Sequence, residues 1–362
     1  MPPSRLESVD VLRGMTIAGM IVVNDPGTWS AVYPQLLHAQ WSGWTYTDTI
    51  FPFFLFVAGV SMALSFGRRR AAGASTGALL RHTAVRAAAL VAIGLALNLV
   101  GYLALDREHL RIPGVLQRIG LCVLAAGTVR LVGGARAAAG AAAALLAGYY
   151  ALLSTGPLDP QGSLAARIDR AVFGDHMWKP GWDPEGLLST LPAIATTLLG
   201  VLAGERLRSN TLLTRKAAEF LAAGTAAAAA GLAWGLVFPI NKSLWTSSYA
   251  LLMSGLACAS LGLCMALVDV RGWKSWAAPF LWLGRNAIAA FTVSALGAIA
   301  LLAVKVAGPD GKPRSLWTAV YRAVFDRFSD PRLGSFLFAL AWLALWVAVF
   351  GLLHRRRLFF KI

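Results

Sequence analysis

Residues 24–56 gather side chains that could do chemistry in a loop between two apolar runs. His38, one of five histidines in the chain, lies there beside Trp41, Trp44 and Asp48. The stretch contains no Lys or Arg, although the formal net charge of the chain is +16. Because the imidazole pKa lies close to neutral pH, His38 is suited to proton transfer or to carrying an acyl group transiently.

Two neighbours could support His38. Asp48 stands where the chain returns to an apolar run, and a carboxylate at that depth is costly unless it is paired. It could orient the imidazole as the acid of a catalytic triad does, and Asn24, which closes the first apolar run, could donate to a carbonyl oxygen. The residues alone leave a second interpretation open, in which Asn24 ends a helix, His38 is a loop residue and the tryptophans form an interfacial aromatic belt.

Further candidates are polar residues within or beside other apolar runs. Arg118 would lie one turn into the membrane, where an arginine usually faces a cavity or a partner unless it snorkels to the interface. Asn286 would lie inside a later run, where an amide commonly bonds to another helix. Asn241, Lys242 and Trp245 stand together with Ser and Thr hydroxyls. This set of donors suits a sugar or, equally, an ordinary capped loop.

Arginines gather at the ends of several apolar runs, and Arg86 is placed deepest among them. Solvated positive charge explains most of these arginines. The competing interpretation is a phosphate clamp, because a guanidinium can form paired hydrogen bonds with phosphate oxygens. Arg86 is therefore the leading candidate for a phosphate contact.

Composition places these residues in a membrane protein. Of all residues, 57% are hydrophobic and only 14% charged, against roughly a quarter charged in a soluble domain. Apolar runs of about 20 residues recur, the length that crosses a bilayer as a helix, without the alternation of transmembrane strands. We predict an all-α, multi-pass protein of the cell (inner or plasma) membrane, in contact with lipid. The ten predicted spans are residues 9–24, 49–67, 84–104, 115–132, 137–154, 187–204, 217–236, 247–268, 278–304 and 335–353.

Charge distribution predicts the orientation. With the N-terminus inside, nineteen of the 33 Lys and Arg residues fall in cytoplasmic segments and eleven in longer outside segments. Because positive residues are retained in the cytoplasm, we predict both termini there, with His38 on the far side. The basic pI then has a topological cause, so no nucleic-acid partner is expected. The three cysteines lie in apolar runs and predict neither a disulfide framework nor a metal site.

Local spacing predicts two details of the helices. Asp10 and Arg13 are three residues apart, so they can pair on one helix face. Asp183 and Pro184 have the residue types of an N-cap and a first helical turn, which would start the sixth span without any functional role.

Several segments together resemble one family of transmembrane enzymes. They are RLESVDVLRGMTIAGMIVVNDPG, LLHAQWSGWTYTDTIFPFFLFVAGVS, RIPGVLQRIGLC, DPEGLLSTLPAIATTLLGVLAGE, NKSLWTSSYALLMSGLA and GRNAI. In this order they resemble the bacterial relatives of heparan-α-glucosaminide N-acetyltransferase. No linker separates two regions of different composition, so we predict a single transmembrane domain over residues 1–362. The resemblance, which covers segments between residue 5 and about residue 290, implies that this domain is an acyltransferase. It also implies transfer of an acetyl group from cytoplasmic acetyl-CoA to the amino group of a glucosamine-type sugar beyond the membrane.

The resemblance also implies roles for residues. The family's catalytic histidine matches His38, and its functional asparagine matches Asn24. The acid of its Thr-x-x-Asp-x-x-Phe-Pro motif matches Asp48. The loop between Asn24 and His38 is slightly longer than in the lysosomal enzyme, so a cell-envelope amino sugar or another amine is an equally expected acceptor.

These implications give a complete set of predicted site residues. His38 would act as a general base or as an acetyl carrier, a choice the sequence leaves open. The predicted residues are His38, Asn24 and Asp48 for catalysis, Arg86, Asn286 and Arg118 for acetyl-CoA, and Trp41, Trp44, Asn241, Lys242 and Trp245 for the acceptor. No metal is expected, and a homodimer is left open. The alternative function is a transporter or flippase for a glycan or a lipid-linked sugar, which would use the same polar cavity without chemistry.

Overall fold

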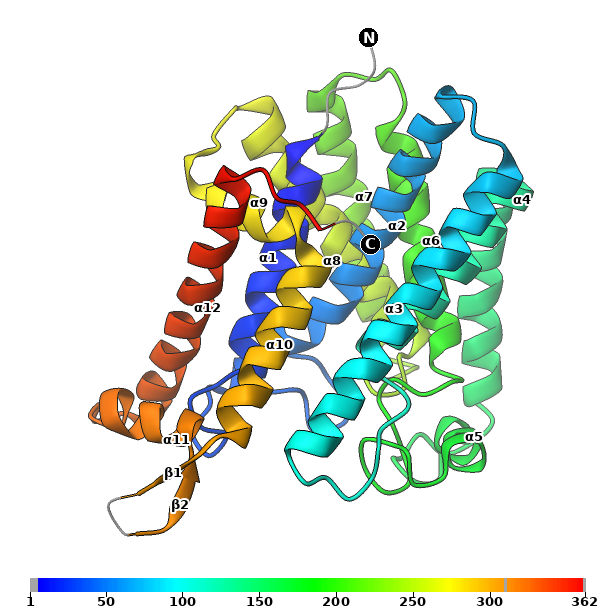
Figure 1. The fold of residues 1–362 in the computed structure, drawn as a ribbon. Coiled ribbons are helices and arrows are strands. Elements are labelled where there is room, and N and C mark those ends of the chain that lie inside the picture. The colour runs from blue at the N-terminus through cyan, green and yellow to red at the C-terminus, as the bar shows by residue number, and fades with distance from the viewer. Residues whose placement is uncertain (1–5, 309–310, 361–362) are drawn as a thin grey trace.

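The computed structural model describes residues 6–308 and 311–360, and it is built almost entirely from helices packed side by side (Figure 1). The long helices are α1 (Glu7–Asn24), α2 (Tyr46–Ala71), α3 (Thr76–Ala104), α4 (Val115–Leu153), α6 (Thr190–Leu207), α7 (Leu213–Trp234), α8 (Ser247–Cys264), α10 (Ala287–Ala303) and α12 (Pro331–Arg355). The shorter helices and turns are η1 (Pro34–Leu36), α5 (Leu164–Phe173), η2 (Met265–Val270), η3 (Ser275–Ala277), α9 (Ala278–Arg285), α11 (Leu316–Val320) and η4 (Tyr321–Phe325). Strands β1 (Lys305–Ala307) and β2 (Pro313–Ser315) pair antiparallel, with Val306 opposite Arg314.

Six helices in the described part of the chain are long and apolar enough to cross a membrane: α2, α3, α4, α7, α8 with η2, and α12. A seventh is obtained if η3 and α9 form one span with α10, although the pair is bent by 79°. The prediction of an all-α protein with several spans is confirmed. The predicted number of ten spans stays a prediction, and the run expected to be one span at 278–304 is broken by this bend.

Helix α4 is too long for one straight crossing and turns at Gly134. Its backbone there has φ 76° and ψ −168°, a conformation that glycine adopts readily. Arg118, near the start of α4, donates to the loop that precedes α6, and Arg130, near the kink, pairs with a glutamate at the far end of α6. Tyr149 in the second arm bonds to the loop that precedes α8, so the second arm returns to the end where the first begins. The two arms correspond to the fourth and fifth predicted spans.

The two ends of the bundle differ in their connections (Figure 1). One end carries the start of α1, the end of α12 and the short links α2–α3 and α6–α7, and we call it the arginine end. The other, the His38 end, carries the long segment between α1 and α2, helix α5 and the β-hairpin. The long loops therefore share one end, as the sequence predicts, whereas the orientation of the bundle in a membrane stays a prediction.

Packing between α1 and α9 depends on two glycines. A Cβ atom built on Gly14 would lie 1.7 Å from the carbonyl oxygen of Phe280, and one on Gly284 would lie 1.9 Å from that of Asp10. The two backbones are thus in direct contact, which no larger residue would allow. This contact places Arg13 of α1 beside the break between α9 and α10. Elsewhere the apolar core lies mainly between α2, α4, α6 and α8.

Candidate active site

A histidine–carboxylate pair lies at the start of α2. His38 Nδ1 is 2.6 Å from Asp48 Oδ1, and the His38 side chain is 52% exposed whereas that of Asp48 is 1% exposed. The other carboxylate oxygen accepts from the backbone of Ala39 and Thr45 and from the Thr45 hydroxyl. Because an ionised carboxylate can only accept hydrogen bonds, Nδ1 carries a proton, so in the neutral form of the ring the lone pair is at Nε2.

The loop before α2 is held in place by short-range bonds. Thr45 and Asp48 form a capping box at the helix start, in which each side chain bonds the backbone of the other residue. The Thr45 hydroxyl lies 2.6 Å from the carbonyl oxygen of Leu37, and the Thr47 hydroxyl 3.2 Å from that of Gln35. These contacts fix the chain immediately before His38, so the imidazole is positioned by local sequence as well as by Asp48.

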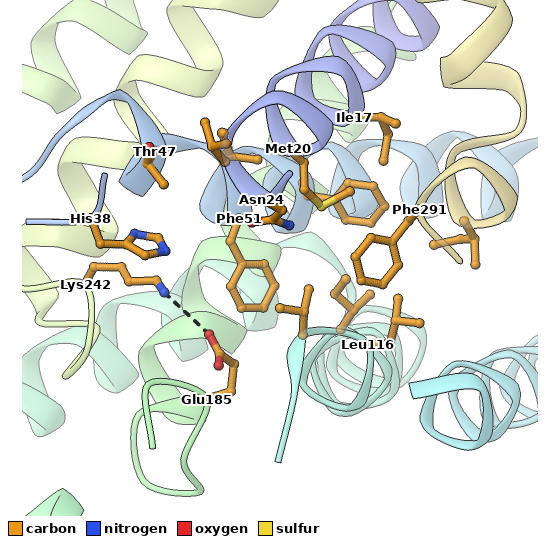
Figure 2. A pocket seen from close by; sticks show the side chains of 16 residues that line it. Ile17, Met20, Asn24, His38, Thr47, Phe51, Leu116, Glu185, Lys242 and Phe291 are labelled. Atoms are coloured by element: carbon orange, nitrogen blue, oxygen red, sulfur yellow. Dashed lines mark ion pairs between the residues drawn. The ribbon is translucent and has the colours of Figure 1, made fainter. Parts of the chain in front are cut away.

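His38 faces a pocket that Asn24 also lines (Figure 2). The wall is mainly apolar and comes from α1, α2, α4 and α10. Its other lining residues are Ile17, Met20, Val23, Thr47, Ile50, Phe51, Phe54, Val115, Leu116, Ile119, Glu185, Lys242, Ile288 and Phe291. The Asn24 amide makes no hydrogen bond to another described residue, so it is free to donate to a bound molecule. We call this space the His38 pocket.

Two charged side chains enter the His38 pocket from distant segments. Lys242 Nζ lies 3.6 Å from Glu185 Oε1, and both point toward the imidazole side of the pocket (Figure 2). Burial alone raises the pKa of Glu185, but Lys242, Arg111 and Arg118 outweigh it and lower that pKa to about 2. Glu185 is therefore an anion at neutral pH and offers the pocket a group that can attract a cation.

The sequence analysis did not identify Glu185 as a site residue. The structure also corrects the prediction that Asp183 caps the start of the sixth span. Helix α6 begins at Thr190, so Asp183 does not cap it. Instead, Asp183 accepts from Arg111 at 2.6 and 2.8 Å, and Arg111 also contacts Glu185. The apparent start motif is thus a buried ion cluster. The available sequence clue was a second carboxylate two residues after Asp183, which an N-cap does not require.

The predicted acceptor residues are only partly brought together. Lys242 lines the His38 pocket, whereas Trp41 and Trp44 do not. Trp41 donates to a backbone oxygen of Leu158 at 2.7 Å, and Trp44 is 39% exposed. Asn241 is 2% exposed, and its side-chain oxygen caps a turn by accepting from the backbone of residue 244. Among these four, Lys242 is in position to contact a molecule beside His38.

Trp245 was predicted to bind the acceptor, and the structure corrects this prediction. Its side chain is fully buried between Phe51 and Tyr249, with ring centroids 5.1 and 5.3 Å away, and its indole donates to Thr196. A bound sugar cannot reach it. Trp245 also stacks against the guanidinium of Arg118 at 5.2 Å, which explains how a charged group is accommodated at that depth.

Of the three residues predicted to bind acetyl-CoA, only Arg118 lies at the opposite end of the bundle from Arg86. Asn286 lies at the same end as Arg86, between two residues that line the same cavity. Arg118 is 1% exposed at the His38 end and contacts Gly186 and Ser189, so it does not join Arg86. Asn286 occupies the break between α9 and α10, where it is 1% exposed and bonds the backbone of residues 358 and 360. Neither side chain lines the His38 pocket.

Arg86 lines a second cavity, at the opposite end of the bundle, which we call the arginine cavity. Its lining includes Arg13, Arg68, Arg69, Arg86 and Arg285 against one acid, Asp10, and its empty volume, which includes space open to solvent, is about 1610 Å³. The Asp10–Arg13 pair predicted from spacing is confirmed at 2.7 Å. The buried Nε of Arg86 has no hydrogen-bond partner among the described residues. The excess positive charge suits an anionic ligand such as a phosphate.

The two cavities meet inside the bundle. Phe54 of α2 and Ile288 of α10 line both the His38 pocket and the arginine cavity. Both side chains are apolar, and they form a wall that the two cavities share. The two cavities therefore lie next to each other inside the bundle.

Fold and site together define a helical, multi-pass membrane protein with a His–Asp pair at one end and an arginine-lined cavity at the other. The chain belongs to a known family, because residues 5–234 match the family described as "Heparan-alpha-glucosaminide N-acetyltransferase, catalytic". It is 30% identical to heparan-alpha-glucosaminide N-acetyltransferase of Homo sapiens over 350 residues, which cover 79% of this chain and 52% of that protein. The Mus musculus protein of the same name is 29% identical over 349 residues, with the same shares. The chain spans about half the length of these curated relatives, and the resemblance predicted from its motifs is confirmed.

Proposed function

We propose that the chain is a transmembrane acetyltransferase. It would move an acetyl group from cytoplasmic acetyl-CoA to the amino group of a glucosamine-type sugar on the other side of the membrane. Family membership supports the reaction type. The observation that carries the proposal is the shared wall of Phe54 and Ile288, because it places an arginine-lined cavity next to the pocket that His38 lines.

The arginine cavity would hold the phosphates of CoA. Three of its five arginines, Arg13, Arg86 and Arg285, are partly buried, so a contact between these guanidiniums and phosphate would be stronger than in water. The pantetheine arm would extend between Phe54 and Ile288 and bring the thioester carbonyl into the His38 pocket. The acceptor would enter from the His38 end, where Glu185 attracts its ammonium and Lys242 contacts its hydroxyls.

Transfer would then follow from groups already in place. The acceptor nitrogen attacks the thioester carbonyl carbon, His38 Nε2 takes a proton from that nitrogen, and Asn24 donates to the developing oxyanion. The C–N bond forms, the C–S bond breaks, and the departing CoA sulfur recovers a proton. Asp48 would hold the imidazole with Nδ1 protonated and stabilise the imidazolium. A covalent acetyl–His38 intermediate uses the same geometry.

The test of this function is thiol release. Purified protein given labelled acetyl-CoA and glucosamine is expected to release free CoA and to form labelled N-acetylglucosamine. Other amino sugars and simple amines would then rank the acceptors. Movement of a sugar across proteoliposomes without any CoA release would instead favour the transporter or flippase alternative.

Arg86→Ala is expected to weaken acetyl-CoA binding by about 10- to 100-fold while the acceptor KM changes little. The physical reason is loss of a buried charge-assisted contact, which contributes about 1.5–3 kcal/mol. Arg81→Ala is the matched control, since Arg81 is an exposed arginine of α3 outside the arginine cavity. Calorimetric titration of the folded variants measures the difference in their affinity for acetyl-CoA. Equal affinities for wild type and Arg86→Ala would exclude a contact between Arg86 and CoA.

The proposed orientation predicts opposite accessibility of two single cysteines. In a cysteine-free background, Ser30→Cys at the His38 end should react with an impermeant maleimide on intact cells. Asn210→Cys at the arginine end should react only after permeabilisation. Both native residues are exposed, so a label can reach either one on its own side. The reversed labelling pattern would place the arginine cavity outside and would contradict transfer from cytoplasmic acetyl-CoA.

A further inference from the structure

The segment that follows α12 turns back across the bundle, and we call residues 356–360 the C-terminal strap. Arg357 adopts φ 58°, a left-handed conformation that is uncommon for residues other than glycine. Its amide and that of Leu358 bond carbonyls of the last turn of α12, at 3.0 and 2.9 Å. Figure 1 shows this red segment leaving α12 and crossing the arginine end toward the middle of the bundle. The turn thus directs the strap over the arginine end, where its residues stay exposed.

Asn286 fastens the strap with both groups of its amide. Its side-chain oxygen accepts from the backbone N–H of Phe360 at 2.9 Å, and its side-chain nitrogen donates to the carbonyl oxygen of Leu358 at 3.5 Å. The side chain sits at the 79° break that separates α9 from α10. Because both hydrogen-bonding groups are occupied by the strap, Asn286 has a structural task at this end of the bundle.

The strap supplies part of the wall of the arginine cavity. Phe360 lines the cavity directly. The neighbouring ring of Phe359 packs against the guanidinium of Arg285 at 6.0 Å and the ring of His354 at 5.8 Å. Arg285 lines the same cavity, so the strap and the arginines form one continuous surface.

Two aromatic residues line the arginine cavity, and they have different positions. Phe54 lies at the shared wall with the His38 pocket, where only the narrow arm of a ligand would pass. Phe360 lies on the strap, held by Asn286 at the arginine end. A ligand with several phosphates and a planar base would therefore meet arginines for its phosphates and one aromatic face for its base.

We propose that the strap is part of the nucleotide-binding site, with Phe360 stacking on the adenine of CoA and Asn286 acting as a positioning residue that fixes Phe360. The inference rests on the proposed function, because it assigns the base of the same co-substrate. Stacking of a base on an aromatic side chain typically contributes about 1–3 kcal/mol, which corresponds to roughly 5- to 150-fold in affinity.

The test compares two ligands on full-length protein in detergent. CoA carries the adenine, whereas 4′-phosphopantetheine lacks the adenosine part but keeps the arm and one phosphate. Phe360→Ala is expected to weaken CoA binding at least fivefold and to leave 4′-phosphopantetheine binding unchanged. Asn286→Ala should show the same selective loss, and Phe360→Trp should retain CoA affinity. Leu352→Ala is the control, since Leu352 is an exposed residue of α12 outside the strap that lines neither cavity.

The possible outcomes distinguish failure of the proposal for the strap from failure of the proposed acetyl transfer. Unchanged CoA affinity in Phe360→Ala, or an equal loss for both ligands, would overturn the assignment of the adenine while acetyl transfer by the wild type still supports the reaction. Wild-type protein that neither binds CoA nor releases it from acetyl-CoA would overturn both proposals together.

Discussion

Replacement of His38 by alanine is expected to lower acetyl transfer by about 10²–10⁴-fold while acetyl-CoA still binds. An acceptor amine is mostly protonated near neutral pH, so a base must act where the acceptor arrives. His38 lines the pocket with Nε2 free, and the arginine cavity that would hold the nucleotide lies at the other end of the bundle. Single-turnover release of CoA measures the loss of acetyl transfer, and a separate measurement of CoA affinity shows whether binding is retained.

The control for His38 is another histidine at the same end. His109→Ala changes an exposed loop residue outside the pocket and should retain wild-type turnover. Near wild-type transfer by His38→Ala would exclude this histidine as the base. A labelled acetyl group on His38 after mixing with acetyl-CoA alone would favour the covalent route. Stable acetyl-CoA until acceptor is added would favour direct attack.

Asp48→Asn is expected to cause a loss of similar size, about 10²–10⁴-fold, without loss of the fold. The carboxylate now accepts from His38 Nδ1 at 2.6 Å and from Ala39 and Thr45 at its other oxygen. An amide must keep its oxygen toward those backbone donors, so its nitrogen faces the imidazole. That arrangement favours the tautomer protonated at Nε2, which cannot accept a proton from the acceptor.

Acetyl-CoA affinity distinguishes this tautomer effect from a general loss of structure. Because Asp48 lies outside the arginine cavity, Asp48→Asn should bind acetyl-CoA as the wild type does while its turnover falls. Asp159→Asn provides the control, since Asp159 is an exposed loop carboxylate that bonds two backbone amides at the same end. Unaltered turnover in Asp48→Asn would show that the carboxylate does not orient the catalytic ring.

Contacts between residues that are close in the sequence could be predicted from the sequence alone. His38 and Asp48 are ten residues apart and are joined by a hydrogen bond, and Asp10 and Arg13 lie on one helical turn. A short loop keeps the first pair close, and helical geometry alone brings the second pair together. Composition likewise determined the all-α membrane class, since runs of about 20 apolar residues have few other stable forms.

Contacts that depend on how the helices pack could not be predicted from the sequence. The sequence predicts Trp245 at an acceptor site and Arg118 at an acetyl-CoA site, yet they bury one another in the core because α4 and α8 meet there. Glu185 reaches the His38 pocket only because the segment before α6 folds over Arg111. A residue's type gives its chemistry, but its face and partners depend on contacts between segments far apart in the chain.

The sequence by itself thus determined the membrane class, the family and the histidine–carboxylate pair. Tertiary structure alone decided that Phe54 and Ile288 join two cavities and that Asn286 fastens residues 358 and 360. The reason is physical: these contacts bridge helices whose crossing depends on close backbone approach, as at Gly14 and Gly284. Such approach depends on the whole packed bundle and on no local pattern.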